Sequence, residues 1–280
     1  MIERTLAFGP GGALVGTVCL PDDGARPAVG LVLFNAGMVH RVGPHRLNVR
    51  LARHLAAGGI PSIRFDLSGQ GDSARPAGNA PFEQQAVSDL RVAMDALAEA
   101  AGVARFALFG FCSGGVHGYA AAQADARVAG LLMYDTYMFR TVRSKVNRYL
   151  LRIRQRGFFP AVLGGLARRP FAPGKPAARG GIGQFPTPKP QDFVNVVRAL
   201  HERGTRVDMV ISGSFLELYN YPGQFRDAFA GTGIEALVDV TFLPSMEHNA
   251  TLLEDQAGFI RCIADWTVKL DRRWQPQGGG

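Results

Sequence analysis

A cysteine in a glycine-rich turn has the clearest potential for chemistry in this sequence. The segment Gly110-Phe111-Cys112-Ser113-Gly114-Gly115 follows the apolar run Arg105–Phe109 and precedes residues of helical composition. In such a strand–turn–helix the exposed residue has a strained backbone, so its neighbours two positions away must be small. Cys112 has glycine at both places, whereas Ser113 has Phe111 at one of them. The pattern predicts that Cys112 is a nucleophile, and the start of a helix favours its thiolate.

A histidine near the C-terminus is the predicted general base. His248 lies between the last predicted strand and the last predicted helix, in a loop that leaves the carboxyl edge of the sheet. A base must reach the nucleophile from that edge. Three other histidines, His54, His117 and His201, lie within predicted helices and are more typical of structural residues.

Two carboxylates compete for the role of the acid that orients His248. Glu217 is the only carboxylate in the segment 211–217, directly after the penultimate strand, and is the favoured choice. Asp135, at the end of an earlier strand, is the alternative. Either residue can fix the tautomer of a histidine.

Two backbone N–H groups are expected to form an oxyanion hole for the developing negative charge. One belongs to Ser113, directly after Cys112, and the other to Gly37, which permits close approach of a substrate. Met38 is an alternative donor. The side chains of Met38 and His40 are expected to line the substrate pocket.

Alternating strands and helices predict the elements that position these residues. Short loops between them indicate right-handed βαβ units and a sheet covered on both faces. The fold class is therefore α/β, with a mostly parallel eight-stranded sheet. The predicted strands are Arg4–Phe8, Leu14–Cys19, Val29–Phe34, Ile60–Asp66, Arg105–Phe109, Val128–Met133, Arg206–Ser212 and Leu237–Leu243.

The alternation is interrupted once, which predicts a cap. Residues 1–135 and 191–274 form the two parts of the core, and residues 136–190 form an insertion above the carboxyl ends of the strands. The first half of the insertion has helical composition, and the second is rich in Gly and Pro. The tail 275–280 is expected to be disordered.

The positive charge of the chain is concentrated in this insertion. The net charge is +8, yet between Tyr137 and Gln191 there are twelve Lys or Arg and no Asp or Glu. The remainder has 19 basic and 23 acidic residues, a net charge of −4. A solvated face explains most charge runs, but the asymmetry also suggests an acidic carrier protein as partner, with anionic lipid as the second choice.

Composition excludes several other classes of protein. No apolar run reaches the length of a membrane span, and the N-terminus lacks the character of a secretory signal. Three cysteines do not form a disulfide framework, which favours the cytoplasm. No pattern predicts a metal, a cofactor or nucleic acid as ligand. The glycine-rich loop Asp66–Ser73 is interpreted as a structural turn because no helix begins within it.

The sequence resembles the α/β-hydrolase superfamily from about Val29 to Leu270. The segment Asn35–Arg46, together with Arg64-Phe65-Asp66 and Gly71-Asp72-Ser73, resembles hydrolases associated with exosortase and exopolysaccharide gene clusters. Those proteins also have a Gly-x-Cys turn, as in Gly110-Phe111-Cys112. Two departures stand out: Asn35-Ala36 replaces the common His-Gly of the oxyanion strand, and Leu216 stands where a catalytic Asp often lies.

These residues predict a cysteine-dependent hydrolase of esters or thioesters with a Cys112–His248–Glu217 triad. An acyltransferase would use the same acyl-enzyme. A third alternative is a non-catalytic binding protein on this scaffold, for which the geometry of the triad should fail.

Overall fold

The computed structural model describes residues 1–22, 27–76, 78–156 and 187–275, and it has the predicted eight-stranded sheet. Each predicted strand corresponds to one observed strand, with ends that differ by a few residues. The strands are β1 (Ile2–Phe8), β2 (Leu14–Leu20), β3 (Val29–Leu33), β4 (Ser62–Phe65), β5 (Arg105–Phe111), β6 (Val128–Tyr134), β7 (Arg206–Ser212) and β8 (Val240–Leu243).

The strand order β1-β2-β4-β3-β5-β6-β7-β8 makes most of the sheet parallel. Strands β1 and β2 form an antiparallel pair, and β2 also pairs antiparallel with β4. All pairs from β4 to β8 are parallel. The carboxyl ends of six strands therefore lie at one edge, so the segments that follow these strands can form a common site.

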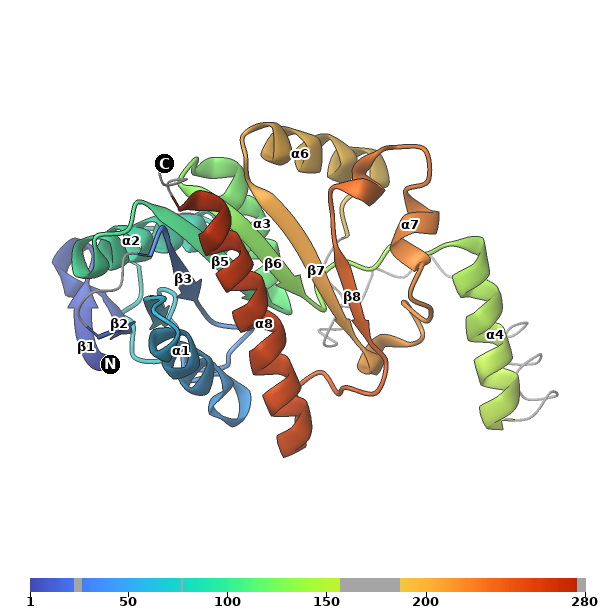
Figure 1. The fold of residues 1–280 in the computed structure, drawn as a ribbon, viewed down its shortest axis with the longest axis horizontal. Helices are drawn as coiled ribbons and strands as arrows, with labels where there is room; N and C mark the ends of the chain where they lie inside the picture. The colour runs from blue at the N-terminus through green and yellow to red at the C-terminus, as the bar shows by residue number, and fades with distance from the viewer. Residues whose placement is uncertain (23–26, 77, 157–186, 276–280) are drawn as a thin grey trace, which may run out of the picture.

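Helices cover both faces of the sheet, as Figure 1 shows. Helices α2 (Phe82–Ala101), α3 (Ser113–Ala124) and α6 (Pro190–Glu202) pack on one face, and α1 (Leu47–Ala57) and α8 (Leu253–Trp274) on the other. Short 3-10 turns lie at Pro10–Gly12, Pro44–Arg46, Gly213–Phe215 and Ile234–Ala236, and the short helix α7 spans Gln224–Ala228.

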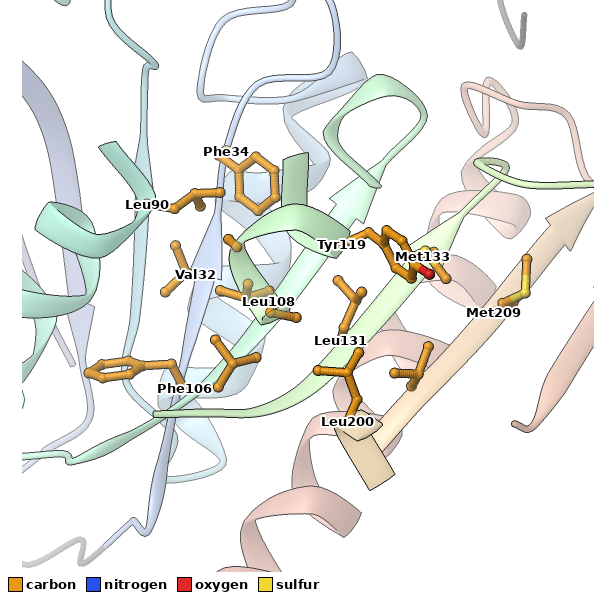
Figure 2. Close-up of a cluster of buried hydrophobic side chains, with 14 of the residues drawn as sticks. Val32, Phe34, Leu90, Phe106, Leu108, Tyr119, Leu131, Met133, Leu200 and Met209 are labelled. Atoms are coloured by element: carbon orange, nitrogen blue, oxygen red, sulfur yellow. The ribbon is translucent and has the colours of Figure 1, made fainter. Parts of the chain in front are cut away.

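Successive side chains of the buried strands alternate between two hydrophobic cores, because a strand points its residues to opposite faces in turn. Val32, Leu108 and Leu131 face the helices α2, α3 and α6 and pack near Leu90 and Tyr119 (Figure 2). The intervening residues face α1 and α8, in the other core; they include Leu31, Leu33, Ala107, Phe109 and Leu132. Continuous apolar runs such as Val29–Phe34 are thus typical of a sheet that is buried on both faces.

Of the predicted insertion, the structure describes residues 136–156 and 187–190. Helix α4 (Val142–Arg156) follows β6 and projects beside the carboxyl edge of the sheet in Figure 1. Its range falls within the helical half predicted for the insertion. The Gly- and Pro-rich half lies almost entirely outside the described residues, as does the predicted tail after residue 275. No helix in the described parts of the chain has the length and apolar character to cross a membrane.

Candidate active site

The turn between β5 and α3 holds Cys112 in a strained conformation. Its φ of 54° and ψ of −118° lie in a region that side chains rarely adopt. A Cβ on Gly110 would lie 2.4 Å from Cα of Gly115, so only glycine fits there. Gly115 is restricted as well, since its Cβ would lie 1.8 Å from Oγ1 of Thr136. The tight turn thus depends on these glycines and places the Cys112 side chain at the carboxyl edge.

Backbone contacts with the next strand hold the turn in place. The Cys112 N–H donates to the carbonyl of Tyr134 at 2.8 Å, and the Thr136 hydroxyl donates to the carbonyl of Cys112 at 3.0 Å. The nucleophile candidate is therefore fixed to the end of β6, the strand that leads to Asp135. These contacts fix the position of Cys112 relative to Asp135.

His248 lies beside Cys112, as expected for the base. Its imidazole is near enough to the Cys112 side chain for Cys112 to raise the pKa of His248, and Nδ1 donates to the Asp135 carboxylate at 2.8 Å. The backbone N–H of His248 donates to Oγ of Ser214 at 2.7 Å. The rings of Phe111 and Phe215 pack at 4.9 and 5.3 Å from the imidazole centroid. These contacts orient the imidazole between the thiol and the carboxylate.

The carboxylate that contacts His248 is not the one that the sequence favoured. The carboxylate that contacts His248 is that of Asp135, the alternative, whereas Glu217 is exposed beyond the 3-10 turn at Gly213–Phe215. Asp135 is fully buried and accepts two further hydrogen bonds, from the backbone N–H and hydroxyl of Ser212 at 2.7 and 2.6 Å. Its φ of 51° turns the chain sharply at the end of β6. The assignment of Glu217 as the acid is therefore wrong in this structure.

Two opposing effects set the protonation of His248. Burial disfavours the imidazolium, but the interactions of the imidazole with the Asp135 carboxylate and with Cys112 outweigh it and raise the pKa of His248 to about 9. The imidazole therefore holds a second proton at neutral pH, which suits a residue that passes a proton to a leaving group.

Gly37 and Ser113, the predicted oxyanion donors, are in contact: Gly37 lies in the loop after β3, and Ser113 is the first residue of α3. The Gly37 N–H donates to the Ser113 hydroxyl oxygen at 2.6 Å, and Gly37 has a φ of +57°. The loop after β3 therefore approaches the turn with Cys112 closely, as an oxyanion hole requires. The side chain of Ser113, and not only its backbone, occupies this place.

A buried network supports the loop after β3. The Asn35 amide donates to Asp66 at 2.8 Å and to the carbonyl of Val39 at 2.7 Å, while its oxygen accepts from the Leu67 N–H. Asp66 is fully buried and also accepts from the N–H of Arg41 at 2.7 Å. Asn35, at the position of the common histidine, thus joins the segments that follow β3 and β4.

His40 belongs to this network and not to the immediate surroundings of Cys112. Its Nε2 lies 3.3 Å from Asp72 and 2.8 Å from the Arg41 guanidinium. His40, Asp66 and Asp72 could together offer ligands to a metal, but Arg41 contacts both carboxylates at 2.5 and 2.6 Å and neutralises them. The expectation that no metal binds remains a prediction.

The predicted pocket residue Met38 is 85% exposed, so the structure does not place it in an enclosed pocket. A cavity of about 290 Å³ lies at the carboxyl side, between Leu150 and Leu151 of α4 and Asn220. Another, of about 240 Å³, lies near Arg206 at the amino end of β7 and is therefore remote from Cys112.

Three polar residues that hold the site together were not predicted from the sequence. Ser212, Ser214 and Thr136 contact Asp135, His248 and Cys112 respectively. One signal was available: Ser212 is the last residue of β7, and Ser214 and Thr136 lie two residues after the ends of β7 and β6, at the carboxyl edge. Serine and threonine are so common in such loops that this position alone does not distinguish them.

The fold and the site define the class. A mostly parallel sheet with a strained residue after β5, followed in chain order by an acid and a histidine, is the α/β-hydrolase fold. A model of the family described as serine aminopeptidase, S33, matches residues 26–158, which include Cys112 and Asp135 but not His248. Where that description specifies serine, this chain has Cys112 at the turn.

Solved structures of similar fold come from several bacteria. An α/β serine hydrolase without a lid from Xanthomonas campestris is 16% identical, with a TM-score of 0.53, over 99% of this chain and 96% of that one. A proline iminopeptidase from Mycobacterium smegmatis is 19% identical, with a TM-score of 0.51, over 97% and 99%. The esterase domain of a Rhodothermus marinus protein is 18% identical, with a TM-score of 0.53, over 96% and 98%. At these identities the likeness establishes the fold alone. A search of the curated proteins gives no match.

Proposed function

We propose that the protein hydrolyses an ester or thioester through an acyl-cysteine intermediate on Cys112, with His248 and Asp135 completing the triad. The observation that carries the proposal is the contact of Cys112, at a strained strand–helix turn, with a histidine that is hydrogen-bonded to a buried carboxylate. The Asn35–Arg46 resemblance to hydrolases of exosortase and exopolysaccharide clusters, which also have a Gly-x-Cys turn, agrees with it.

The reaction proceeds in two steps, acylation of Cys112 and hydrolysis of the acyl-cysteine. Cys112 attacks the carbonyl carbon as the thiolate, its proton being held by the His248 imidazolium, and the carbonyl electron pair moves to oxygen, which the oxyanion hole stabilises. The carbonyl reforms as the bond to the alcohol or thiol breaks, and His248 protonates that leaving group. Water then attacks the acyl-cysteine while His248 accepts its proton, and the carboxylic acid leaves as the Cys112 thiolate returns.

An apolar acyl chain is the substrate group that the surface favours. Of the eleven exposed large hydrophobic side chains among the described residues, nine lie in segments that follow the carboxyl ends of parallel strands. These nine are Met38, Val39, Phe82, Val142, Val146, Tyr149, Leu150, Leu252 and Leu253. An apolar surface concentrated on the side of Cys112 supports recognition of an apolar group there.

An acidic carrier is the partner that we propose for this acyl group. Arg140, Arg143, Lys145 and Arg148 lie beside the carboxyl edge, and no acidic residue occurs in the segment 136–156. A phosphopantetheine-bearing carrier protein has the opposite charge and would be steered toward this side of the molecule. Such a carrier would present its acyl thioester at the edge where Cys112 lies. We also propose that the protein acts in the cytoplasm, where a reducing environment preserves a catalytic thiol.

Acyl transfer is the second candidate, since it shares the acyl-cysteine and differs only in the group that attacks it. Water is the simpler acceptor, because it needs no binding site for a second substrate. A non-catalytic binding protein on this scaffold would be expected to lack a carboxylate within reach of His248. In the described site the Asp135 carboxylate lies 2.8 Å from Nδ1 of His248, which disfavours this alternative.

Trapping the acyl-enzyme tests the proposal. The protein is mixed with a panel of acyl esters and acyl thioesters, quenched in acid and digested, and the peptide that contains Cys112 is examined by mass spectrometry. We expect an acyl adduct on this peptide, and none in Cys112→Ala.

The other cysteines serve as internal controls. Burial raises the pKa of Cys19 to about 11, and burial also raises the pKa of Cys262, so both are poor nucleophiles. Iodoacetamide should therefore label Cys112 first and abolish turnover. Labelling confined to Cys19 or Cys262 with loss of activity, or turnover by Cys112→Ala, would contradict the proposal.

A further inference from the structure

The hydroxyl of Ser113 occupies an unusual place beside the nucleophile. Ser113 is the first residue of α3 and is 8% exposed. Its oxygen accepts the Gly37 N–H at 2.6 Å, so the backbone donor of the loop after β3 already has a side-chain partner. An oxyanion hole made of two backbone N–H groups alone would leave this donor open to the substrate.

The hydrogen-bonding capacity of a hydroxyl decides what this contact can do. A serine hydroxyl has one proton to donate and two lone pairs that accept. The bond from Gly37 uses one lone pair and leaves the proton available, and no described residue accepts that proton. A buried donor without an acceptor is unfavourable, so a substrate oxygen beside Cys112 would gain from it.

From this contact we infer that the Ser113 hydroxyl donates to the oxyanion and relays the Gly37 N–H to it, as a catalytic residue distinct from the Ser113 backbone. The inference rests on the proposed acyl chemistry at Cys112. When the thiolate attacks, charge develops on the carbonyl oxygen, and the Ser113 O–H points its proton at that oxygen while Gly37 polarises the hydroxyl. Ser113 is thus unsuited to be the nucleophile but is well placed to stabilise the product of the attack.

The opposite role is a plug, in which the hydroxyl occupies the hole and must rotate away before a substrate binds. The two roles predict opposite effects of removing the hydroxyl. Under the donor role Ser113→Ala slows acylation, whereas under the plug role it accelerates it. Ser113→Thr keeps the hydroxyl and should restore most of the rate under the donor role.

The experiment compares 4-nitrophenyl acetate with its thiono analogue, in which sulfur replaces the carbonyl oxygen. The burst of 4-nitrophenolate gives the acylation rate for the wild type, Ser113→Ala and Ser113→Thr. For the oxygen ester we expect a 10- to 100-fold slower acylation in Ser113→Ala, with KM nearly unchanged. The thiono ester, whose sulfur accepts hydrogen bonds poorly, should be affected several-fold less, so the preference for oxygen over sulfur declines in this variant.

Ser62→Ala is the matched control, because Ser62 is also fully buried and its hydroxyl has no partner among the described residues, but it lies in β4. It should acylate like the wild type. Equal or faster acylation by Ser113→Ala, or an equal loss with both esters, overturns the inference. A wild type that gives no burst and no adduct on Cys112 instead contradicts the proposed function, so the two failures are distinguishable.

Discussion

At the scale of single residues, the site depends on which carboxylate supports His248. Asp135 is buried and bound by both donors of Ser212, so its geometry is fixed before a substrate arrives. Glu217 is exposed and lies in a different segment. A fixed carboxylate holds the imidazole in one tautomer and stabilises its charged form, which is the usual role of the acid in such a triad.

Asp135→Asn should therefore reduce kcat by about 10³- to 10⁴-fold, because the amide cannot stabilise the imidazolium and favours the wrong tautomer. Steady-state kinetics with an acyl thioester measure the loss. Glu217→Gln is the matched control, because the exposed Glu217 is not the carboxylate that contacts His248. It should retain activity within about threefold, which corresponds to less than about 1 kcal/mol in the activation free energy. Comparable losses in both variants would argue against Asp135 as the acid.

The raised pKa of His248 sets the alkaline limit of activity. We expect kcat/KM to fall as pH rises through about 9, where the imidazolium loses its proton. The same pairing stabilises the fold below pH 6.5, the ordinary pKa of histidine, and this contribution is lost as pH rises through about 9. In Asp135→Asn the alkaline limb should move to lower pH, because the main partner that raises the pKa is gone. A pH–rate profile measures the alkaline limb in the wild type and in Asp135→Asn. An unchanged alkaline limb in the variant would refute the role of Asp135 in raising the pKa of His248.

At the scale of elements, the turn from β5 to α3 is the most constrained part of the site. Gly110 and Gly115 approach each other, and Gly115 also meets Thr136 after β6. The turn is thus packed against the neighbouring strand end, which carries Asp135. Its geometry follows from backbone contacts that a side chain on either glycine would break.

Gly115→Ala should destabilise the protein by about 1–3 kcal/mol, the usual cost of overpacking, since the new methyl collides with Thr136. Thermal unfolding measures the effect. Gly78→Ala is the control: nothing lies within 4 Å of its added methyl, and its stability should match the wild type. If Gly115→Ala unfolds like Gly78→Ala, the turn is looser than the structure indicates.

At the scale of the whole molecule, the features that we connect with function lie at the carboxyl edge of the sheet. The carboxyl edge carries the proposed triad, most exposed apolar side chains of the described residues, and the basic helix α4. Association with an acidic carrier should then depend on ionic strength, because opposite charges accelerate encounter and salt screens them.

Hydrolysis of a carrier-bound acyl thioester should therefore slow by about tenfold or more between low and high salt, while that of a small neutral ester changes little. Replacing Arg140, Lys145 and Arg148 by Gln should remove most of this salt dependence. The charge-matched control replaces three exposed arginines by Gln: Arg4 in β1, and Arg272 and Arg273 at the end of α8. Equal salt responses for both substrates would indicate that the charges of α4 are merely solvated and do not bind an acidic carrier.

The sequence by itself determined the sheet, its helices and the place of Cys112 at a strained turn. Apolar runs such as Val29–Phe34, the small residues around Cys112 and the position of His248 after the last strand are local patterns, and local sterics and burial suffice to interpret them. The eight strands and the position of Cys112 at a strained turn follow from these patterns.

Only the tertiary structure decided which residues meet at the site. Asp135 and Glu217 both follow parallel strands, so both end at the same edge, and the sequence offers no local difference that selects between them. The choice depends on distances between neighbouring strands: Ser212 at the end of β7 binds Asp135 at the end of β6, which points the carboxylate at His248. The Ser113–Gly37 contact has the same origin, since 76 residues separate the two partners in the chain and only the packing of β3 beside β5 joins them.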